Sequence, residues 1–410
     1  MFGSEKPENF INLNIKKADI KPLTLSMSDL LTVALIYLLQ LLFVPFALFF
    51  DMNDVILQFV SLISFMAAYI TYSKITSISK SSFSIVLAVI FCLIVGAAVI
   101  PLAIVVSLIF SVCTLSYIFG TENKTSIRAF FAAIPALSWI IASILLKNLV
   151  FSTIVLFHIP AALLLAYAIR KGAHRVSSIC RVSVGIIISI FTIFAVCFFF
   201  KSGTDIRALP EFIANAKENL TNFYYNFISN EYLARIPEGT VEMSHTDIMT
   251  LASSTVKLLF IFLPAIVITV ANILAFFIHS ITIKILLRTQ QDHSKIASMV
   301  NFDMTLLSAI VFLSAFLISA IMSEGEMSVV SVGMANIAII FMPGLIYTTI
   351  MTFNTFLALK PSCGGSILYL ALIFFTVSFA AVMLPLVSIA GAVIIIVANI
   401  TKHRLLNKKN

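Results

Sequence analysis

Residues Phe83 to Gly120 read FSIVLAVIFCLIVGAAVIPLAIVVSLIFSVCTLSYIFG, without one charged residue. As a single helix it would be about 57 Å long at 1.5 Å per residue. The hydrocarbon core of a bilayer is only about 30 Å thick. We therefore expect a helical hairpin that crosses a membrane twice and turns near Pro101.

The composition of the whole chain points to the same environment. The 410 residues are 60% hydrophobic and 11% charged, whereas a soluble domain is about 45–50% apolar and about 25% charged. Long apolar runs recur from Leu30 to Ile400. The sequence thus predicts an all-α polytopic transmembrane bundle whose main partner is the lipid bilayer.

Apolar blocks of about 20 residues predict twelve membrane spans. Blocks that are too long for one crossing divide at Pro101, Lys147 and Pro385. Seven spans precede a polar segment, and they are Leu30–Phe50, Val55–Tyr72, the halves of Phe83–Gly120 and of Ala129–Ile169, and Val182–Phe200. Five follow it, and they are Leu258–Leu287, Leu306–Met322, Val329–Leu357 and the halves of Ile367–Ile400.

The distribution of charge predicts the orientation of these spans. Basic residues gather in every second loop, as expected for cytoplasmic loops, and the lone exception is Lys147. The net charge of +8 therefore indicates orientation in a membrane and not a nucleic-acid partner. The predicted layout places both ends in the cytoplasm. Its parts are a cytoplasmic segment (1–28), a membrane bundle (29–200), an extracytoplasmic segment (201–255), a second bundle (256–400) and a basic tail (401–410).

The extracytoplasmic segment carries a helical pattern of its own. An apolar residue recurs every three or four positions, with polar residues mostly between them. This predicts an amphipathic helix that rests on the outer membrane surface or caps the bundle, and the alternative is a helix of a soluble loop. Ser244 and Asp247 resemble a capping box that starts the next helix. The apolar positions are Phe212, Ile213, Ala216, Leu220, Phe223, Tyr224 and Phe227.

Polar side chains in the middle of spans are the candidate ligand-binding residues, because such groups are costly in lipid. They are Gln40, His158, Asn272 and Asn336. His158 is the most interesting, since an imidazole two residues before Pro160 can bind a ligand or relay a proton. The alternative for all four is an interhelical hydrogen bond. His279, near a cytoplasmic helix end, is expected to need no special role.

Helix breaks are the second kind of candidate site. Pro343 with Gly344, and also Pro264, interrupt long apolar helices and free backbone carbonyls. The alternative at each position is a simple kink. Glycine is scarce, at 13 residues, so we expect the bundle to pack mainly through Ile, Leu and Phe.

The sequence carries no phosphate-binding loop, no zinc-binding histidine pair and no nucleophile elbow. We therefore expect no enzyme activity, no cofactor and no catalytic or metal site. The five cysteines show neither a metal-ligand spacing nor a pair in an oxidising loop, so they are expected to be free thiols.

The order of segments resembles the YybS-like family of uncharacterised bacterial multi-pass membrane proteins. The resemblance rests on an acidic outer amphipathic segment, on Leu263-Pro264-Ala265, and on Asn336 with Met342-Pro343 in one long span, followed by the charged end Lys402-His403-Arg404. It implies a location in the bacterial cytoplasmic membrane and no particular activity.

Two functions from different classes fit these features. The first is small-molecule transport or substrate capture in the membrane, which the kinked helices and mid-span polar residues favour. The alternative is a non-transporting scaffold or regulator of a cell-envelope process, with a protein partner on the outer segment. The absence of two acidic residues at mid-depth in any span favours this alternative over ion-coupled transport.

Overall fold

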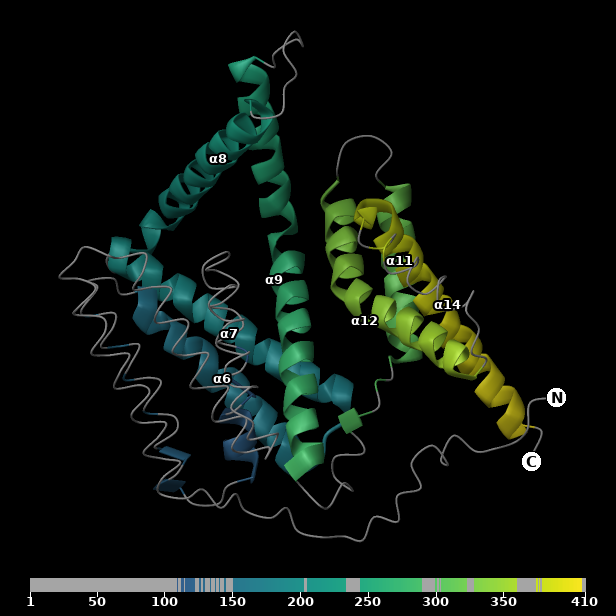
Figure 1. The fold of residues 1–410 in the computed structure, drawn as a ribbon. Helices are drawn as coiled ribbons and strands as arrows, with labels where there is room; N and C mark the ends of the chain where they lie inside the picture. Colours follow the sequence, from purple (N-terminus) through teal and green to yellow (C-terminus); the bar gives the residue numbers. More distant parts are fainter. Residues whose placement is uncertain are drawn as a thin grey trace. The chain divides into compact units, whose positions relative to one another are not determined.

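The computed structural model describes residues 150–202, 205–233, 244–289, 299–300, 302, 304–322, 328–359, 374, 376 and 378–407, together with individual residues between 109 and 144. All regular elements in these ranges are helices, and no strand occurs in them (Figure 1). The all-α prediction is therefore confirmed for this part of the chain. The first two predicted spans, the turn near Pro101 and Gln40 lie outside the described residues.

Seven α-helices and one short 3-10 helix are described with both ends, and the described residues between 109 and 144 are helical as well. The elements with both ends described are α6 (Val150–Lys171), α7 (Arg175–Ser202), η2 (Ile206–Ala208), α8 (Leu209–Leu233), α9 (His245–Thr289), α11 (Leu306–Ile321), α12 (Val329–Leu359) and α14 (Ala380–Asn407). Four stretches are long and apolar enough to cross a membrane, and they are Arg175–Phe199, His245–Leu287, Val329–Leu357 and Val382–Thr401. Each overlaps a predicted span. The total of twelve spans and their orientation stay predictions.

Helix α9 is longer than the predicted eighth span. It has 45 residues, which corresponds to about 68 Å. The capping box predicted at its start is confirmed, because the Asp247 N–H donates to Ser244 Oγ at 3.2 Å and the Ser244 N–H donates to Asp247 Oδ2 at 3.3 Å. No glycine or proline follows until Pro264, so the capped helix continues directly into the apolar stretch.

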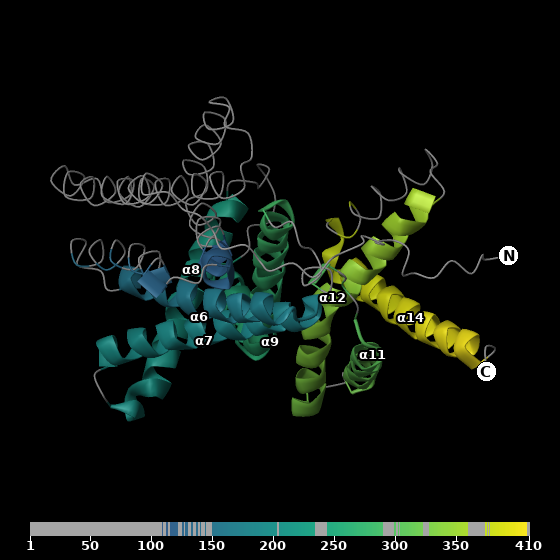
Figure 2. The ribbon, with the colours of Figure 1, turned by 90° about the horizontal axis from the view of Figure 1, so that it is seen from below.

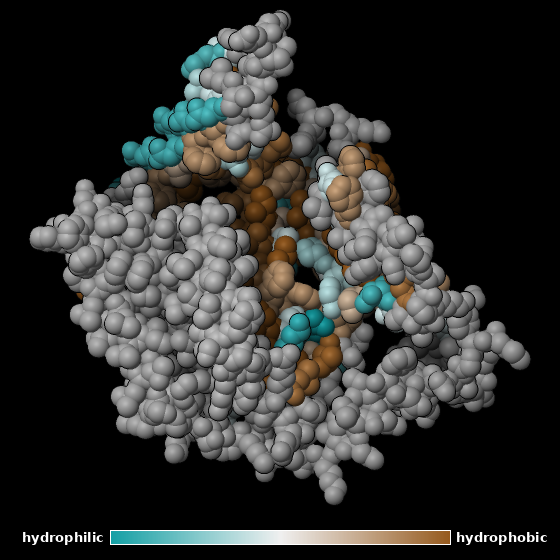
Figure 3. Space-filling model, in the orientation of Figure 1, coloured by the Kyte–Doolittle hydropathy of each residue, from teal (hydrophilic) through white to brown (hydrophobic). Residues whose placement is uncertain are grey.

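The predicted outer helix is present as α8. Hydrophilic residues line one edge of it and hydrophobic residues line the other (Figure 3). The Phe212 ring packs against the end of α7, with ring centroids 5.6 Å from Phe194 and 5.4 Å from Phe198. Phe223 and Phe227, further along the apolar stripe, are exposed. That this apolar stripe lies on a membrane surface stays a prediction.

The chain divides into two compact units, and the division falls inside α7 and α9. The first unit contains residues up to Ile193 and Ala271–Asp303, and the second contains Phe194–Val270 and Met304–Asn410. In the second unit, α11, α12 and α14 lie side by side (Figures 1 and 2). Each unit has a hydrophobic core of its own.

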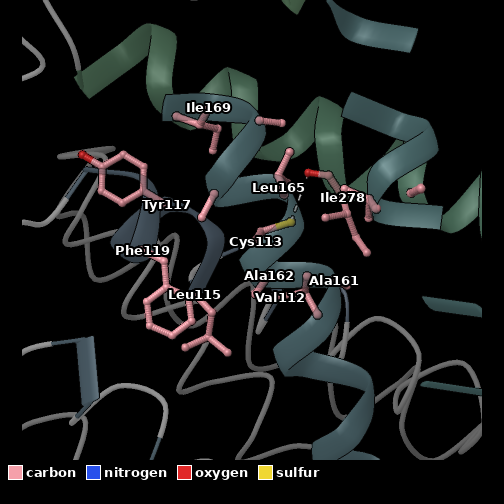
Figure 4. Packing of buried hydrophobic residues seen from close by; sticks show 14 of the residues in the cluster. Val112, Cys113, Leu115, Tyr117, Phe119, Ala161, Ala162, Leu165, Ile169 and Ile278 are labelled. Atoms are coloured by element: carbon pink, nitrogen blue, oxygen red, sulfur yellow. Dashed lines mark hydrogen bonds between the residues drawn. The ribbon is translucent and has the colours of Figure 1, made fainter. Parts of the chain in front are cut away.

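The core of the first unit is built where α6 meets α7, α9 and the residues around Cys113. Ala161 and Ala162 pack beside Val112 and Leu165 (Figure 4). Cys113 is a free thiol that donates to the Ile278 carbonyl at 3.4 Å. At Gly185 on α7, an added Cβ would lie 2.9 Å from Ala161 Cα, so α6 and α7 touch through their backbones.

The second core repeats this mode of packing. Its fully buried members include four alanines around Phe312 and Leu345, and they are Ala309, Ala315, Ala338 and Ala392. The predicted dependence on Ile, Leu and Phe was therefore wrong at the closest helix crossings. Small residues are needed there because two backbones approach without side chains between them.

Candidate functional site

Asn272, a predicted site residue, is hydrogen-bonded across the first unit. Ser183 Oγ on α7 donates to Asn272 Oδ1 on α9 at 2.6 Å. The amide is half-buried, and the bond ties two helices in an environment that offers little water. At this position the alternative expectation, an interhelical hydrogen bond, is what the structure contains.

Asn336 makes a more elaborate contact, in the second unit. Its Oδ1 accepts from the Ala265 N–H at 3.2 Å, and its Nδ2 donates to the Ile261 carbonyl at 3.3 Å. In an uninterrupted helix these two backbone groups would bond to each other, since they are four residues apart. The Asn336 side chain thus bonds to both members of one backbone donor–acceptor pair of α9. This pair lies beside Pro264, which has no N–H of its own.

The proline positions predicted as helix breaks lie inside continuous helices. Pro264 is within α9, and Pro343 and Gly344 are within α12. The Gly344 carbonyl accepts a hydrogen bond from Thr348 Oγ1, one turn later in α12, at 2.9 Å. Asn336 therefore adds two interhelical hydrogen bonds to the backbone of α9 beside Pro264.

Replacing Asn336 with leucine is expected to lower the free energy of unfolding by about 1–2 kcal/mol, because two interhelical hydrogen bonds to the backbone of α9 are lost. The loss should shrink when Pro264 is also replaced by alanine, since alanine restores the backbone N–H that proline lacks. The check is a double-mutant cycle on thermal unfolding in detergent. Equal losses with and without Pro264 would contradict a role of Asn336 that depends on the proline.

His279 is the residue whose burial the sequence did not predict. It is 1% exposed, and neither ring nitrogen has a hydrogen-bond partner among the described residues. The available signal was its helical spacing, because it lies four residues after buried Ala275 and seven after Asn272 on the same face of α9. Because His279 lies near the end of the predicted span, this spacing was given no weight in the prediction.

The surroundings of His279 are held in place by Arg175 at the start of α7. Its guanidinium donates to the Val300 carbonyl at 2.9 Å and to Ser280 Oγ at 3.1 Å. It also lies 5.0 Å from the centroid of the Phe276 ring and 5.7 Å from that of Phe302. Because Ser280 is the next residue after His279, this clamp fixes the turn of α9 that presents the imidazole.

The remaining site predictions are only partly placed. His158 lies on α6, two residues before Pro160, and its side chain lies outside the described part of the structure, as does Gln40. Asn272 and Asn336 each have their own partner and share none. Within the described residues, no three His, Cys, Asp or Glu side chains are grouped to hold a metal ion. The chemistry that this region offers is hydrogen bonding.

Long apolar helices joined by partly buried polar contacts are those of an integral membrane protein of the helical-bundle class. Comparisons with protein-family models, curated proteins and solved structures find no match for this chain.

Proposed function

We propose that this protein transports a small polar molecule across the membrane and that His279 is a contact on its path. The observation that carries the proposal is the buried imidazole without a hydrogen-bond partner in the described residues. A neutral imidazole has one donor and one acceptor. Each buried group that stays unsatisfied costs about 1–3 kcal/mol, which a passing polar solute or water would relieve.

The neighbouring charge narrows the class of solute. The guanidinium of Arg175 binds Ser280, the residue next to His279, and so places a positive charge at this level of α9. A cationic solute would be repelled there, whereas a neutral or anionic molecule with hydrogen-bonding groups would not. Ionisable residues inside membrane spans commonly mark such paths.

A test that needs no knowledge of the substrate is accessibility from both sides of the membrane. In a chain whose five native cysteines are replaced by serine, His279→Cys is exposed to a membrane-impermeant thiol reagent in right-side-out and in inverted vesicles. A carrier exposes its site alternately to the two sides, so labelling is expected from both. The control is Ile278→Cys, which is fully buried and should stay unlabelled. Labelling of His279→Cys from one side only, or from neither, would refute transport.

A second candidate function is a non-transporting scaffold or regulator. It is favoured by the use of Asn272 Oδ1 and of both side-chain amide atoms of Asn336 in contacts between helices, which leaves these three atoms unavailable to a solute. Such a protein would be a solid bundle, and both cysteine variants would resist labelling. Deleting α8 should then change the set of proteins that co-purify with it.

Membership of the YybS-like family, twelve spans and a bacterial cytoplasmic membrane complete the proposal. They are supported by the order of the described elements, in which the amphipathic helix α8 precedes α9 with Pro264 and α12 with Asn336 and Pro343.

A further inference from the structure

The hairpin of α6 and α7 carries positive charge that the surrounding sequence does not balance. No aspartate or glutamate occurs between Glu122 and Asp205. The two helices meet at a tight turn, where Gly172 has a φ of 60° that favours glycine. Four basic residues gather around this turn, and they are Arg170, Lys171, Arg175 and Arg181.

Two of these four cations, Arg170 and Arg175, hydrogen-bond to other residues of the first unit. The Arg170 Nε–H donates to the Phe119 carbonyl at 3.0 Å, and Arg175 forms the clamp beside Ser280. Both are therefore part of the packing of the first unit.

Lys171 and Arg181 contact the face of one tyrosine instead. Lys171 Nζ lies 5.9 Å from the centroid of the Tyr167 ring, and the guanidinium carbon of Arg181 lies 5.2 Å from it. The Arg181 Nη1 atom is buried and has no hydrogen-bond partner in the described part of the chain. A guanidinium in such a position is stabilised by an anion that accepts its hydrogen bonds.

The side of the hairpin that carries this basic cluster is apolar toward the middle of the membrane. Leu163 lies one turn before Tyr167 on α6, and Val184 and Ile188 follow Arg181 by three and seven residues on α7. Tyr167 is 52% exposed, and the other three side chains are about half exposed as well. The cations at the helix ends are thus followed along both helices by half-exposed apolar side chains.

We propose that Lys171, Tyr167 and Arg181 bind the phosphate of an anionic phospholipid whose acyl chains lie along Leu163, Val184 and Ile188. The planar guanidinium offers two parallel N–H donors to phosphate oxygens, and the lysine adds a point charge. Tyrosine is enriched at this depth of a membrane, and basic sites between membrane helices bind acidic head groups. The lipid belongs to the leaflet that the positive-inside rule assigns to the cytoplasm.

The apolar face is what selects a lipid over a soluble phosphate. A free phosphate ester would use the same three polar side chains but would leave Leu163, Val184 and Ile188 uncovered. A lipid satisfies the cations and covers the face at once. The inference is independent of the proposed transport at His279, because none of its residues takes part in that site.

The test is native mass spectrometry of the full chain in detergent, titrated with phosphatidylglycerol and, separately, with phosphatidylcholine. Wild type should bind phosphatidylglycerol in preference, and Arg181→Gln should weaken that binding about tenfold. Tyr167→Leu, which leaves both charges in place, should weaken it less. The matched control is Lys284→Gln, which changes an exposed lysine near the C-terminal end of α9. This variant should bind phosphatidylglycerol as wild type does.

Two outcomes would overturn the proposal. One is equal phosphatidylglycerol binding by wild type, Arg181→Gln and Tyr167→Leu. The other is displacement of the lipid by glycerol 3-phosphate at an equal concentration, which would show that the site takes a soluble anion. Retained binding in the presence of excess glycerol 3-phosphate, lost in Arg181→Gln, supports the lipid.

Discussion

Replacing Gly391 with alanine is expected to destabilise the group of α11, α12 and α14. We expect this loss to be larger than that of a glycine-to-alanine change at any other described helical glycine. A Cβ at this position of α14 would overlap the Leu345 carbonyl oxygen of α12 and would lie 2.8 Å from Thr349 Oγ1. The helix axes must separate, because a backbone carbonyl cannot rotate away as a side chain can. Overpacking of this kind costs about 1–3 kcal/mol or more.

A second contact at the same crossing adds to the loss. Thr349 Oγ1 donates to the Val387 carbonyl of α14 at 2.8 Å. When the helices separate, this interhelical hydrogen bond lengthens as well. The combined effect should appear as a lower midpoint of thermal unfolding in detergent and as a reduced yield of monodisperse protein.

Gly333 provides the matched control for this experiment. It lies inside α12, and an added Cβ would meet nothing within 4 Å. Gly333→Ala should therefore stabilise the protein by up to about 1 kcal/mol, because alanine favours a helix over glycine. The same chemical change is thus expected to have opposite signs at the two positions. An unfolding midpoint of Gly391→Ala at or above that of wild type would disprove the close crossing.

The helices themselves were predictable because their signals are local. The apolar runs at Leu306 and Val329 start α11 and α12 at the predicted residues. The capping box at Ser244 depends on residues three apart, and it formed as expected. The length of α9 was underestimated because hydropathy marks the lipid-embedded part of a helix and not its capped polar extension.

The contacts between helices were not predictable from one sequence. Gly185 and Gly391 have their role only because Ala161 and Leu345 face them, and these partners are distant along the chain. Asn336 hydrogen-bonds to the backbone of α9 beside Pro264, and nothing in the sequence around either residue indicates this contact. The burial of His279 follows from helix packing as well, and its position near a span end does not indicate it.

The clamp at Arg175 shows how such a distant contact governs the candidate site. Replacing Arg175 with methionine keeps much of the side-chain length but removes every donor and the charge. The Val300 carbonyl and Ser280 Oγ then lose their partner, and the contacts with the Phe276 and Phe302 rings lose their electrostatic part. We expect a loss of about 2–4 kcal/mol of stability, because charge-assisted hydrogen bonds and partly desolvated cation–π contacts are each worth more than their exposed counterparts.

Two variants separate the roles of charge and shape at this position. Arg175→Lys keeps the charge but cannot bind two acceptors with a planar fork, so its unfolding midpoint should fall between those of wild type and Arg175→Met. His174→Ala changes the exposed neighbour and should leave the midpoint unchanged. If Arg175→Met unfolds at the wild-type temperature, the clamp does not hold α7 to α9. If it unfolds earlier and also makes His279→Cys react faster with the thiol reagent, the clamp is what keeps the imidazole buried.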